Sequence, residues 1–456
     1  MARFPRSFLP LAALATGSLL ATPLARAQHA PAPRPLDARL GLARDPGIAA
    51  LLRDISPAQI RATDSTLVTF GTRHTMSDTT SSTRGIGAAR RWLFAKLSAY
   101  GAACGGCLKV EYDPAMVEVS RHPQKPTVNV VNVLAWLPGR DTTRVVVITG
   151  HYDSCICAVD PFDVTSDAPG ADDDGSGTSA VVELARVFSK RYPKGLSHSV
   201  LFALVAGEEQ GLLGSRHLAE RLHQQGYTVL GDMSDDLDGN VSADNGRTDS
   251  TTMRIYSGDP DNSPSRELAR YAAALGRTYT PSFNILSVFR IDRIGRGTDH
   301  EPFVFLGDPG IRTTERMEAL DRQHRPADTF EHVNFAYTAN IARVNAAVLA
   351  TLASAPPPPD SVRARRVAPY GQSWNITWNP APGAASYEVL VRSTTSPTWE
   401  RVIPVGNGTS YELDEQLDDL WAGVRSVGAD GHRSLAVTVP QPRPIRPPSA
   451  AAAMRR

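Results

Sequence analysis

The chain has 456 residues, of which 41% are hydrophobic and 21% are charged, the composition of an ordinary soluble globular protein. Its formal net charge is +1 and its basic residues are scattered, so electrostatics give no reason to expect binding to nucleic acid or to an acidic membrane surface. The length allows two or three domains.

The N-terminal segment has the pattern of a cleaved secretory signal. Arg3 and Arg6 precede an apolar run over residues 8–24, and Ala25-Arg26-Ala27 then offers small residues at the spacing that a signal peptidase requires. A membrane anchor is the alternative, but the run is short of a full span and is interrupted by two prolines and a glycine. We therefore expect residues 1–27 to be removed, leaving an exported protein, periplasmic or extracellular, with no membrane span.

Strands and helices are predicted to alternate along the first three quarters of the chain. Helical spacing of apolar residues predicts a helix over 87–100, and two apolar runs at 128–137 and 145–148 are predicted to be adjacent strands. The other predicted elements are, in chain order, a helix from Ser176, a strand over 201–206, a helix over 215–225, a strand over 253–256, and helices over 264–275 and 335–352.

This alternation predicts an α/β domain in which helices flank a mixed, mainly parallel sheet. Ligands bind such sheets outside the carboxyl ends of the strands. His151 and the pair Glu208-Glu209 each follow an apolar strand directly, so we expect them to lie together at that edge.

Four cysteines occur as two close pairs. Cys104 and Cys107 flank two glycines, and Cys155 and Cys157 flank an isoleucine. Disulfides persist in an oxidising compartment, and four cysteines allow three pairings that the sequence does not separate. We expect structural disulfides that fix the loop beside His151, with a cysteine-ligated zinc as the alternative.

The run Pro356–Pro359 separates the α/β domain from a different kind of sequence. Beyond it, runs at 374–378, 387–391 and 421–427 are separated by turn residues, which predicts a β-sandwich. These runs resemble a fibronectin type III module, although Trp421 stands where that family often has tyrosine. We expect the α/β domain over 28–355, a linker over 356–360, the sandwich over 361–440 and a disordered, proline-rich tail over 441–456.

Three polar clusters carry the candidate chemistry: His151-Tyr152-Asp153, the aspartates 172–174 between glycines, and Glu208-Glu209. Carboxylates crowded into a cleft repel one another, so a bound cation would explain the crowding. Histidine and carboxylate are zinc ligands, and of two adjacent glutamates one can bind metal while the other acts as a base. The structural alternatives are a hydrogen-bonded histidine, an acidic helix cap and surface charge.

Asp153, the segment Ala168–Gly177 (Ala-Pro-Gly-Ala-Asp-Asp-Asp-Gly-Ser-Gly) and the segment Gly207–Ser215 (Gly-Glu-Glu-Gln-Gly-Leu-Leu-Gly-Ser) resemble the secreted zinc aminopeptidases of the bacterial leucyl aminopeptidase type. The resemblance covers roughly residues 60 to 350. It implies a zinc exopeptidase fold that holds two Zn²⁺ ions. It also implies that N-terminal residues are hydrolysed from peptides with a free N-terminus by a metal-activated water, with a glutamate as the general base.

The resemblance also implies a set of site residues. Glu208, as the base, and Asp153 would be catalytic, and the metal ligands would be His151, Asp173 as the bridge, Glu209, Asp236 and His324.

Two of these ligands are chosen from the surrounding residues. The glycines at 231 and 239 set the register that selects Asp236, and Asp238 is the alternative because several aspartates crowd this stretch. His324 is chosen because Asp328-Thr329 begins four residues later, as in the family. His300 belongs to a family segment that lies near the pocket and does not usually bind metal.

Rival interpretations are a glutaminyl cyclase with one zinc, a carboxypeptidase of the same superfamily, and a non-catalytic protein that binds a partner through the sandwich. A substrate panel of aminoacyl anilides, N-blocked peptides and peptides that begin with glutamine separates the enzymes. The C-terminal module is expected either to contact a surface or glycan or to stabilise the chain.

Overall fold

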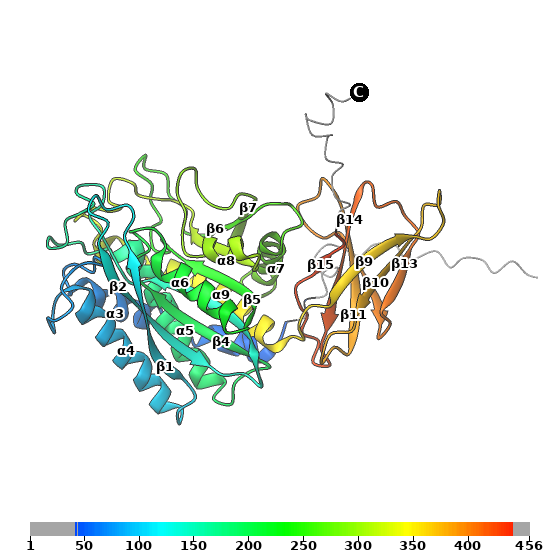
Figure 1. Ribbon diagram of the computed structural model, residues 1–456, viewed down its shortest axis with the longest axis horizontal. Coiled ribbons are helices and arrows are strands. Elements are labelled where there is room, and N and C mark those ends of the chain that lie inside the picture. Colours follow the sequence, from blue (N-terminus) through cyan, green and yellow to red (C-terminus); the bar gives the residue numbers. More distant parts are fainter. Residues whose placement is uncertain (1–41, 43, 441–456) are drawn as a thin grey trace, which may run out of the picture. The chain divides into compact units, whose positions relative to one another are not determined.

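A computed structural model describes residue 42 and residues 44–440, so the predicted signal peptide (1–27) and tail (441–456) lie outside the described part. An eight-stranded mixed sheet carries helices on both faces, and a smaller all-β region follows it in the chain (Figure 1). This architecture confirms the predicted fold class.

The large sheet has the strand order β1-β2-β4-β3-β5-β8-β6-β7. Its strands are β1 (Lys109–Glu118), β2 (Thr127–Leu137), β3 (Asp141–His151), β4 (His198–Val205), β5 (Thr228–Asp235), β6 (Thr252–Ser257), β7 (Asn284–Val288) and β8 (Gly310–Glu315). Strands β4, β3, β5 and β8 are parallel to one another, so their carboxyl ends meet at one edge of the sheet.

Helices cover the two faces unequally. The larger core takes in α2 (Pro46–Arg53), α3 (Pro57–Val68), α4 (Gly85–Ala103), α5 (Gly177–Arg191), α7 (Pro264–Tyr279) and α9 (Phe335–Ser354), and the smaller one takes in α6 (Leu213–Gln224) and α8 (Glu301–Leu306). Val146 and Ile148 of β3 point into the first core, whereas Val145 and Val147 point into the second. Both faces of β3 are therefore buried, which explains its continuous apolar sequence.

The prediction that the runs 128–137 and 145–148 form adjacent strands is wrong. Strand β4 lies between them, pairing antiparallel with β2 and parallel with β3. A short connection between two apolar runs is typical of a hairpin, but here it only returns the chain to the sheet one strand away. Sequence analysis also missed β1, whose alternating burial is weak, the buried strand β5, and the short strands β7 and β8.

The C-terminal region forms two antiparallel sheets, with orders β13-β10-β9 and β12-β11-β14-β15. Its strands are β9 (Asp360–Arg366), β10 (Trp374–Asn379), β11 (Ser386–Ser393), β12 (Arg401–Gly406), β13 (Ser410–Leu413), β14 (Leu420–Val427) and β15 (Val437–Thr438). Ile376 of the first sheet and Val389 and Val424 of the second are fully buried in one core between them.

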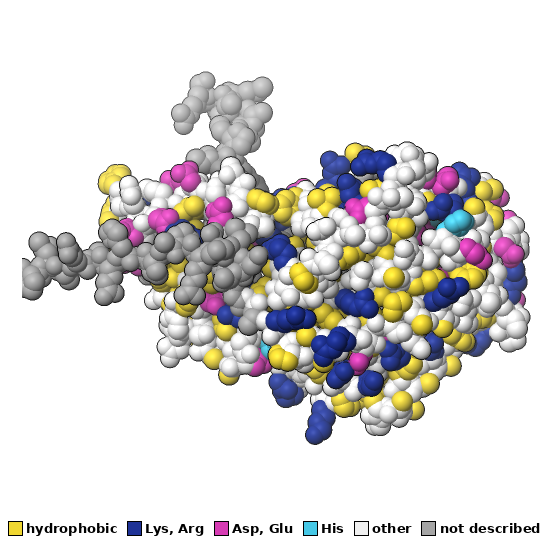
Figure 2. All heavy atoms as spheres, turned by 180° about the vertical axis from the view of Figure 1, so that it is seen from behind, with side chains coloured by type: hydrophobic (Ala, Val, Ile, Leu, Met, Phe, Trp, Pro, Cys, Tyr) yellow, Lys and Arg dark blue, Asp and Glu magenta, His cyan; other side chains and the backbone are white. Residues whose placement is uncertain are grey.

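The surface agrees with the scattered charge of the sequence. On the face shown in Figure 2, lysine and arginine side chains are dispersed among hydrophobic and neutral ones. Among the described residues, no helix combines the length and the apolar character needed to span a bilayer.

Candidate metal centre

The candidate centre lies where three neighbouring parallel strands end. His151 is the last residue of β3, Glu208 and Glu209 follow β4 after a two-residue turn, and Asp236 follows β5 directly. The strand order β4-β3-β5 therefore places these side chains next to one another, at the edge that the sequence predicted for His151 and Glu208-Glu209.

Asp173 stands between two histidines. Its Oδ1 lies 3.3 Å from Nε2 of His151, and its Oδ2 lies 3.0 Å from Nε2 of His324. Asp236 Oδ1 is 3.9 Å from the same nitrogen of His151, and Glu209 Oε2 is 3.1 Å from that of His324. The five predicted ligands thus form two groups of three that share one carboxylate.

These donors fit a divalent cation. His151 is 1% exposed, and its Nε2 has no hydrogen-bond partner among the described residues, as is also true of Oε1 of Glu209. Candidate ligand atoms of His151, Asp173 and Asp236 lie within 4.8 Å of one another. A buried imidazole nitrogen surrounded by carboxylate oxygens is the donor set that zinc and similar ions accept.

Asp153 supports the backbone of Glu208 and Glu209 and the ring of His151. Its carboxylate accepts hydrogen bonds from the backbone N–H groups of Glu208 and Glu209, each at 3.3 Å, and from the Thr75 hydroxyl at 3.2 Å. Nδ1 of His151 lies 3.2 Å from the Asp153 carbonyl oxygen and 3.6 Å from its carboxylate. A proton on Nδ1 would leave the Nε2 lone pair directed at Asp173, which is the usual arrangement of a metal-binding histidine.

The loop that carries Asp173 is fixed by buried polar contacts. Gly170 has φ of +51°, and a Cβ there would meet the Asp173 carbonyl oxygen at 2.6 Å, so only glycine fits. The Arg73 guanidinium donates to the carbonyls of Pro169 at 2.6 Å and Gly170 at 2.8 Å. Asp328, four residues after His324, accepts from the backbone N–H of Asp173 at 3.0 Å and so supports the same loop.

The flanking aspartates have structural contacts instead. Asp172 accepts from the Gly239 N–H at 2.8 Å, and Asp174 accepts from the N–H groups of His151 at 3.0 Å and Gly177 at 2.9 Å. Asp174 therefore links the end of β3 to the start of α5. Of the three adjacent aspartates, Asp173 faces the histidines, whereas Asp172 and Asp174 hydrogen-bond to the backbone and stabilise the loop.

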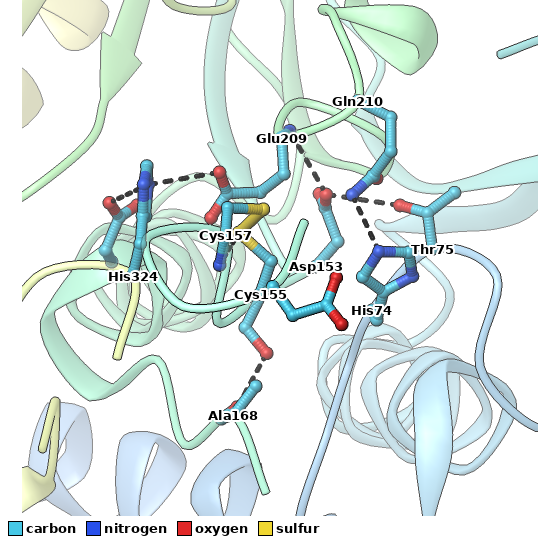
Figure 3. The surroundings of a disulfide bond; sticks show 12 residues. His74, Thr75, Asp153, Cys155, Cys157, Ala168, Glu209, Gln210 and His324 are labelled. Atoms are coloured by element: carbon cyan, nitrogen blue, oxygen red, sulfur yellow. Dashed lines mark hydrogen bonds and ion pairs between the residues drawn. A yellow bond between two sulfur atoms is a disulfide. The ribbon is translucent and has the colours of Figure 1, made fainter. Parts of the chain in front are cut away.

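His324 lies in a long loop after β8, with φ of +57°. Its carbonyl oxygen accepts from the N–H of Ala158 at 3.2 Å, and Ala158 directly follows the disulfide between Cys155 and Cys157. Figure 3 shows Glu209 and His324 facing each other beside this disulfide. The second disulfide joins Cys104 to Cys107, so the structure chooses one of the three pairings that the sequence left open.

The position of Cys155 bears on the alternative of a cysteine ligand. Candidate ligand atoms of Cys155, Glu209 and His324 lie within 4.8 Å of one another. In the disulfide, however, its sulfur is bonded to Cys157 and is not a thiolate. The oxidised chain therefore offers the imidazole and the carboxylates as donors at this position.

Asp236 and Asp238, the two alternatives, differ in direction. The buried guanidinium of Arg312 pairs with Asp236 at 3.1 Å and with Asp292 at 3.2 Å, which aims Asp236 at His151. Asp238 is fully buried away from this group, and its N–H donates to Ser176 at 2.9 Å. The geometry favours Asp236 as the side chain that faces His151.

The crowding of carboxylates and histidines shifts the pKa values of the groups in the centre. Burial opposes ionisation of Asp173, but the two histidines outweigh burial and hold the pKa of its carboxyl well below its usual range. Burial likewise opposes protonation of His324, yet Glu209 and Asp173 raise its pKa to about 12. Burial, reinforced by nearby carboxylates, raises the pKa of Glu208 well above its ordinary value. The carboxylates around the two histidines therefore favour the presence of positive charge at this position.

The centre opens into a cavity of about 450 Å³ whose lining includes Asp173, Glu208, Asp236 and His324. Gln323 also lines it and donates to Asp173 Oδ2 at 2.5 Å. His300 is directed elsewhere, because its Nε2 contacts the Ile291 carbonyl oxygen at 2.8 Å. Sequence analysis missed Gln323 and Arg312, which carry no spacing pattern that would mark them.

Comparison with known proteins places this geometry among peptidases. Residues 132–349 match the model of peptidase family M28. A probable zinc metalloprotease of Leptosphaeria maculans is 37% identical over 86% of this chain and 96% of its own length, and one of Pyrenophora teres is 37% identical over 86% of each.

Solved structures show the same fold. The aminopeptidase LapA of Legionella pneumophila covers 72% of this chain and 78% of its own, with a TM-score of 0.55 and 22% identity. An aminopeptidase from Aneurinibacillus covers 66% of this chain and 95% of its own, with a TM-score of 0.50 and 16% identity.

Proposed function

This chain belongs to peptidase family M28, and from that premise and the geometry of the centre we propose that it is a zinc-dependent aminopeptidase with two metal ions. The observation that carries the proposal is Asp173, whose two oxygens face two different histidines. His151 and Asp236 would hold one zinc ion, His324 and Glu209 the other, and Asp173 both.

When bound, the zinc pair would polarise the scissile carbonyl and lower the pKa of a water molecule. Glu208 lines the same cavity as Asp173 and His324 but belongs to neither group of ligands, so its carboxylate remains available as the general base. In this proposal Glu208 accepts the proton of the attacking water and passes it to the leaving amine. Asp153 keeps Glu208 and Glu209 in place through their backbone N–H groups.

Exopeptidase specificity for the N-terminal residue is proposed from the aminopeptidase-like motifs at 168–177 and 207–215. The test is a panel of an aminoacyl anilide, an N-blocked peptide and a peptide that begins with glutamine. We expect the anilide to be hydrolysed with release of the amine, the blocked peptide to stay intact and the glutamine peptide not to be cyclised. Cyclisation of the glutamine peptide without hydrolysis would indicate a cyclase, and removal of the last residue from a blocked peptide would indicate a carboxypeptidase.

We also propose a domain organisation for the whole chain. Residues 1–27 would be a signal peptide, 28–355 the peptidase domain, 356–360 a linker, 361–440 a fibronectin type III-like module that contacts a surface or glycan, and 441–456 a tail. N-terminal sequencing of protein recovered outside the cytoplasm should then begin near Gln28. A mature protein that still begins at Met1 would contradict the export proposal.

A further inference from the structure

A second hollow, of about 370 Å³, adjoins the metal centre and is lined by arginines. We call it the arginine pocket, and its charged lining consists of Arg247, Arg254, Arg293, Arg296, Arg316 and Glu318. Arg293 and Arg296 also line the cavity of the metal centre, so the two spaces share a wall.

Three of these guanidinium groups share a single carboxylate. Arg293 and Arg296 donate to the same oxygen of Glu318, at 3.0 and 2.9 Å, and Arg254 donates to the other oxygen. One negative charge cannot neutralise three positive ones. Arg293 is also paired with Asp292 at 3.1 Å, but that carboxylate is shared with the buried Arg312.

The other two arginines have no acidic partner in the part of the chain that the structure describes. Arg247 is exposed on the loop before β6, and Arg316 is half-buried directly after β8. No ion pair joins either side chain to a described carboxylate, although Asn245 accepts from the Arg247 backbone N–H at 3.1 Å. The arginine pocket therefore carries a surplus of positive charge.

A short chain of hydrogen bonds connects the pocket to the metal centre. Arg296 Nη2 donates to Gln323 Oε1 at 2.8 Å, and Gln323 Nε2 donates to Asp173 Oδ2 at 2.5 Å. A ligand group held by Arg296 would therefore be linked through Gln323 to Asp173, which faces the two histidines. This proximity suits a second part of the same substrate molecule.

We propose that the arginine pocket binds a carboxylate of the peptide substrate, so that the enzyme prefers acidic or short peptides. Guanidinium groups bind carboxylates through paired, charge-assisted hydrogen bonds, which amides cannot replace. The carboxylate could be a side chain of aspartate or glutamate near the cleaved bond, or the free C-terminus of a very short peptide. This inference rests on the proposed peptidase activity and names its substrate class.

Matched peptides distinguish the two sources of the carboxylate. Leucyl-glutamine amide is the neutral reference, leucyl-glutamate amide adds a side-chain carboxylate, and leucyl-glutamine with a free C-terminus adds a terminal one. We expect kcat/KM to be about 10–100-fold higher for at least one acidic peptide than for the reference, the range expected for a charge-assisted hydrogen bond. The preference should weaken at high salt.

The variant Arg247→Gln with Arg316→Gln removes the charge that has no acidic partner. It should abolish most of the preference while leaving hydrolysis of the neutral peptide nearly unchanged. Arg363→Gln with Arg365→Gln, two exposed positions on β9, removes the same charge from the C-terminal region and should leave the preference intact. Equal kcat/KM for all three peptides, or a preference that survives in the pocket variant, would overturn the proposal.

Binding separates this inference from the proposed function. In a Glu208→Gln background, calorimetry measures the affinity of each peptide without turnover. Tighter binding of an acidic peptide, lost in the pocket variant, would support the pocket even if no peptide were cleaved. Equal affinities would overturn it even if the neutral peptide were cleaved normally by the unaltered enzyme.

Discussion

Replacing Asp173 by asparagine should weaken both metal positions at once. The carboxylate oxygens lie 3.3 and 3.0 Å from the two histidine nitrogens, so each oxygen would serve one ion. A charge-assisted contact is worth about 1.5–3 kcal/mol, so each ion, which loses one such contact, should bind about 10–100-fold more weakly. Activity should fall with metal content, because neither position would remain complete.

The assay is a competition between the protein and a zinc chelator of known affinity, followed by metal analysis of the dialysed protein. The matched control is Asp172→Asn, since that neighbour accepts from the Gly239 N–H at 2.8 Å and does not face the histidines. The thermal midpoint of each variant identifies any unfolding. Wild-type zinc affinity in folded Asp173→Asn protein would show that Asp173 does not bridge and would refute this reasoning.

Three further changes test the supporting parts of the site. Glu208→Gln should retain zinc while kcat falls by about 10²–10⁴, and near-normal turnover would exclude it as the base. Replacing both Cys155 and Cys157 by serine should weaken metal binding at His324 by about 10–100-fold in a cobalt titration, because the disulfide fixes the chain just before Ala158, whose N–H donates to the His324 carbonyl. Unchanged affinity would show that the disulfide gives no such support. Gly170→Ala should lower the free energy of unfolding in urea by about 1–3 kcal/mol, since φ is +51°, and an unchanged midpoint would mean that the loop adapts.

The sequence identified the elements of the site where side chains follow buried strands. Uninterrupted apolar runs mark β3 and β4, and because parallel strands share a carboxyl edge, the sequence alone predicts that His151 and Glu209 lie close together. His324, by contrast, is indicated by family spacing alone, because a loop after a short strand carries no periodic pattern.

The strand order and the long-range contacts of the site could not be predicted from the sequence, for physical reasons. The order of strands in a sheet depends on long-range pairing, which is why β4 could not be placed between β2 and β3. Arg312 and Gln323 act through contacts with residues 76 and 150 positions away, and such pairs leave no local signature. The arginine pocket likewise assembles from four separate stretches of chain.

The central claim is that two zinc ions share Asp173, and anomalous X-ray scattering at the zinc edge from crystals of the metal-loaded protein tests it most directly. We expect two peaks, one among His151, Asp236 and Asp173 and the other among His324, Glu209 and Asp173. A single peak under zinc saturation, or a pair of peaks that Asp173 does not touch, would contradict the claim.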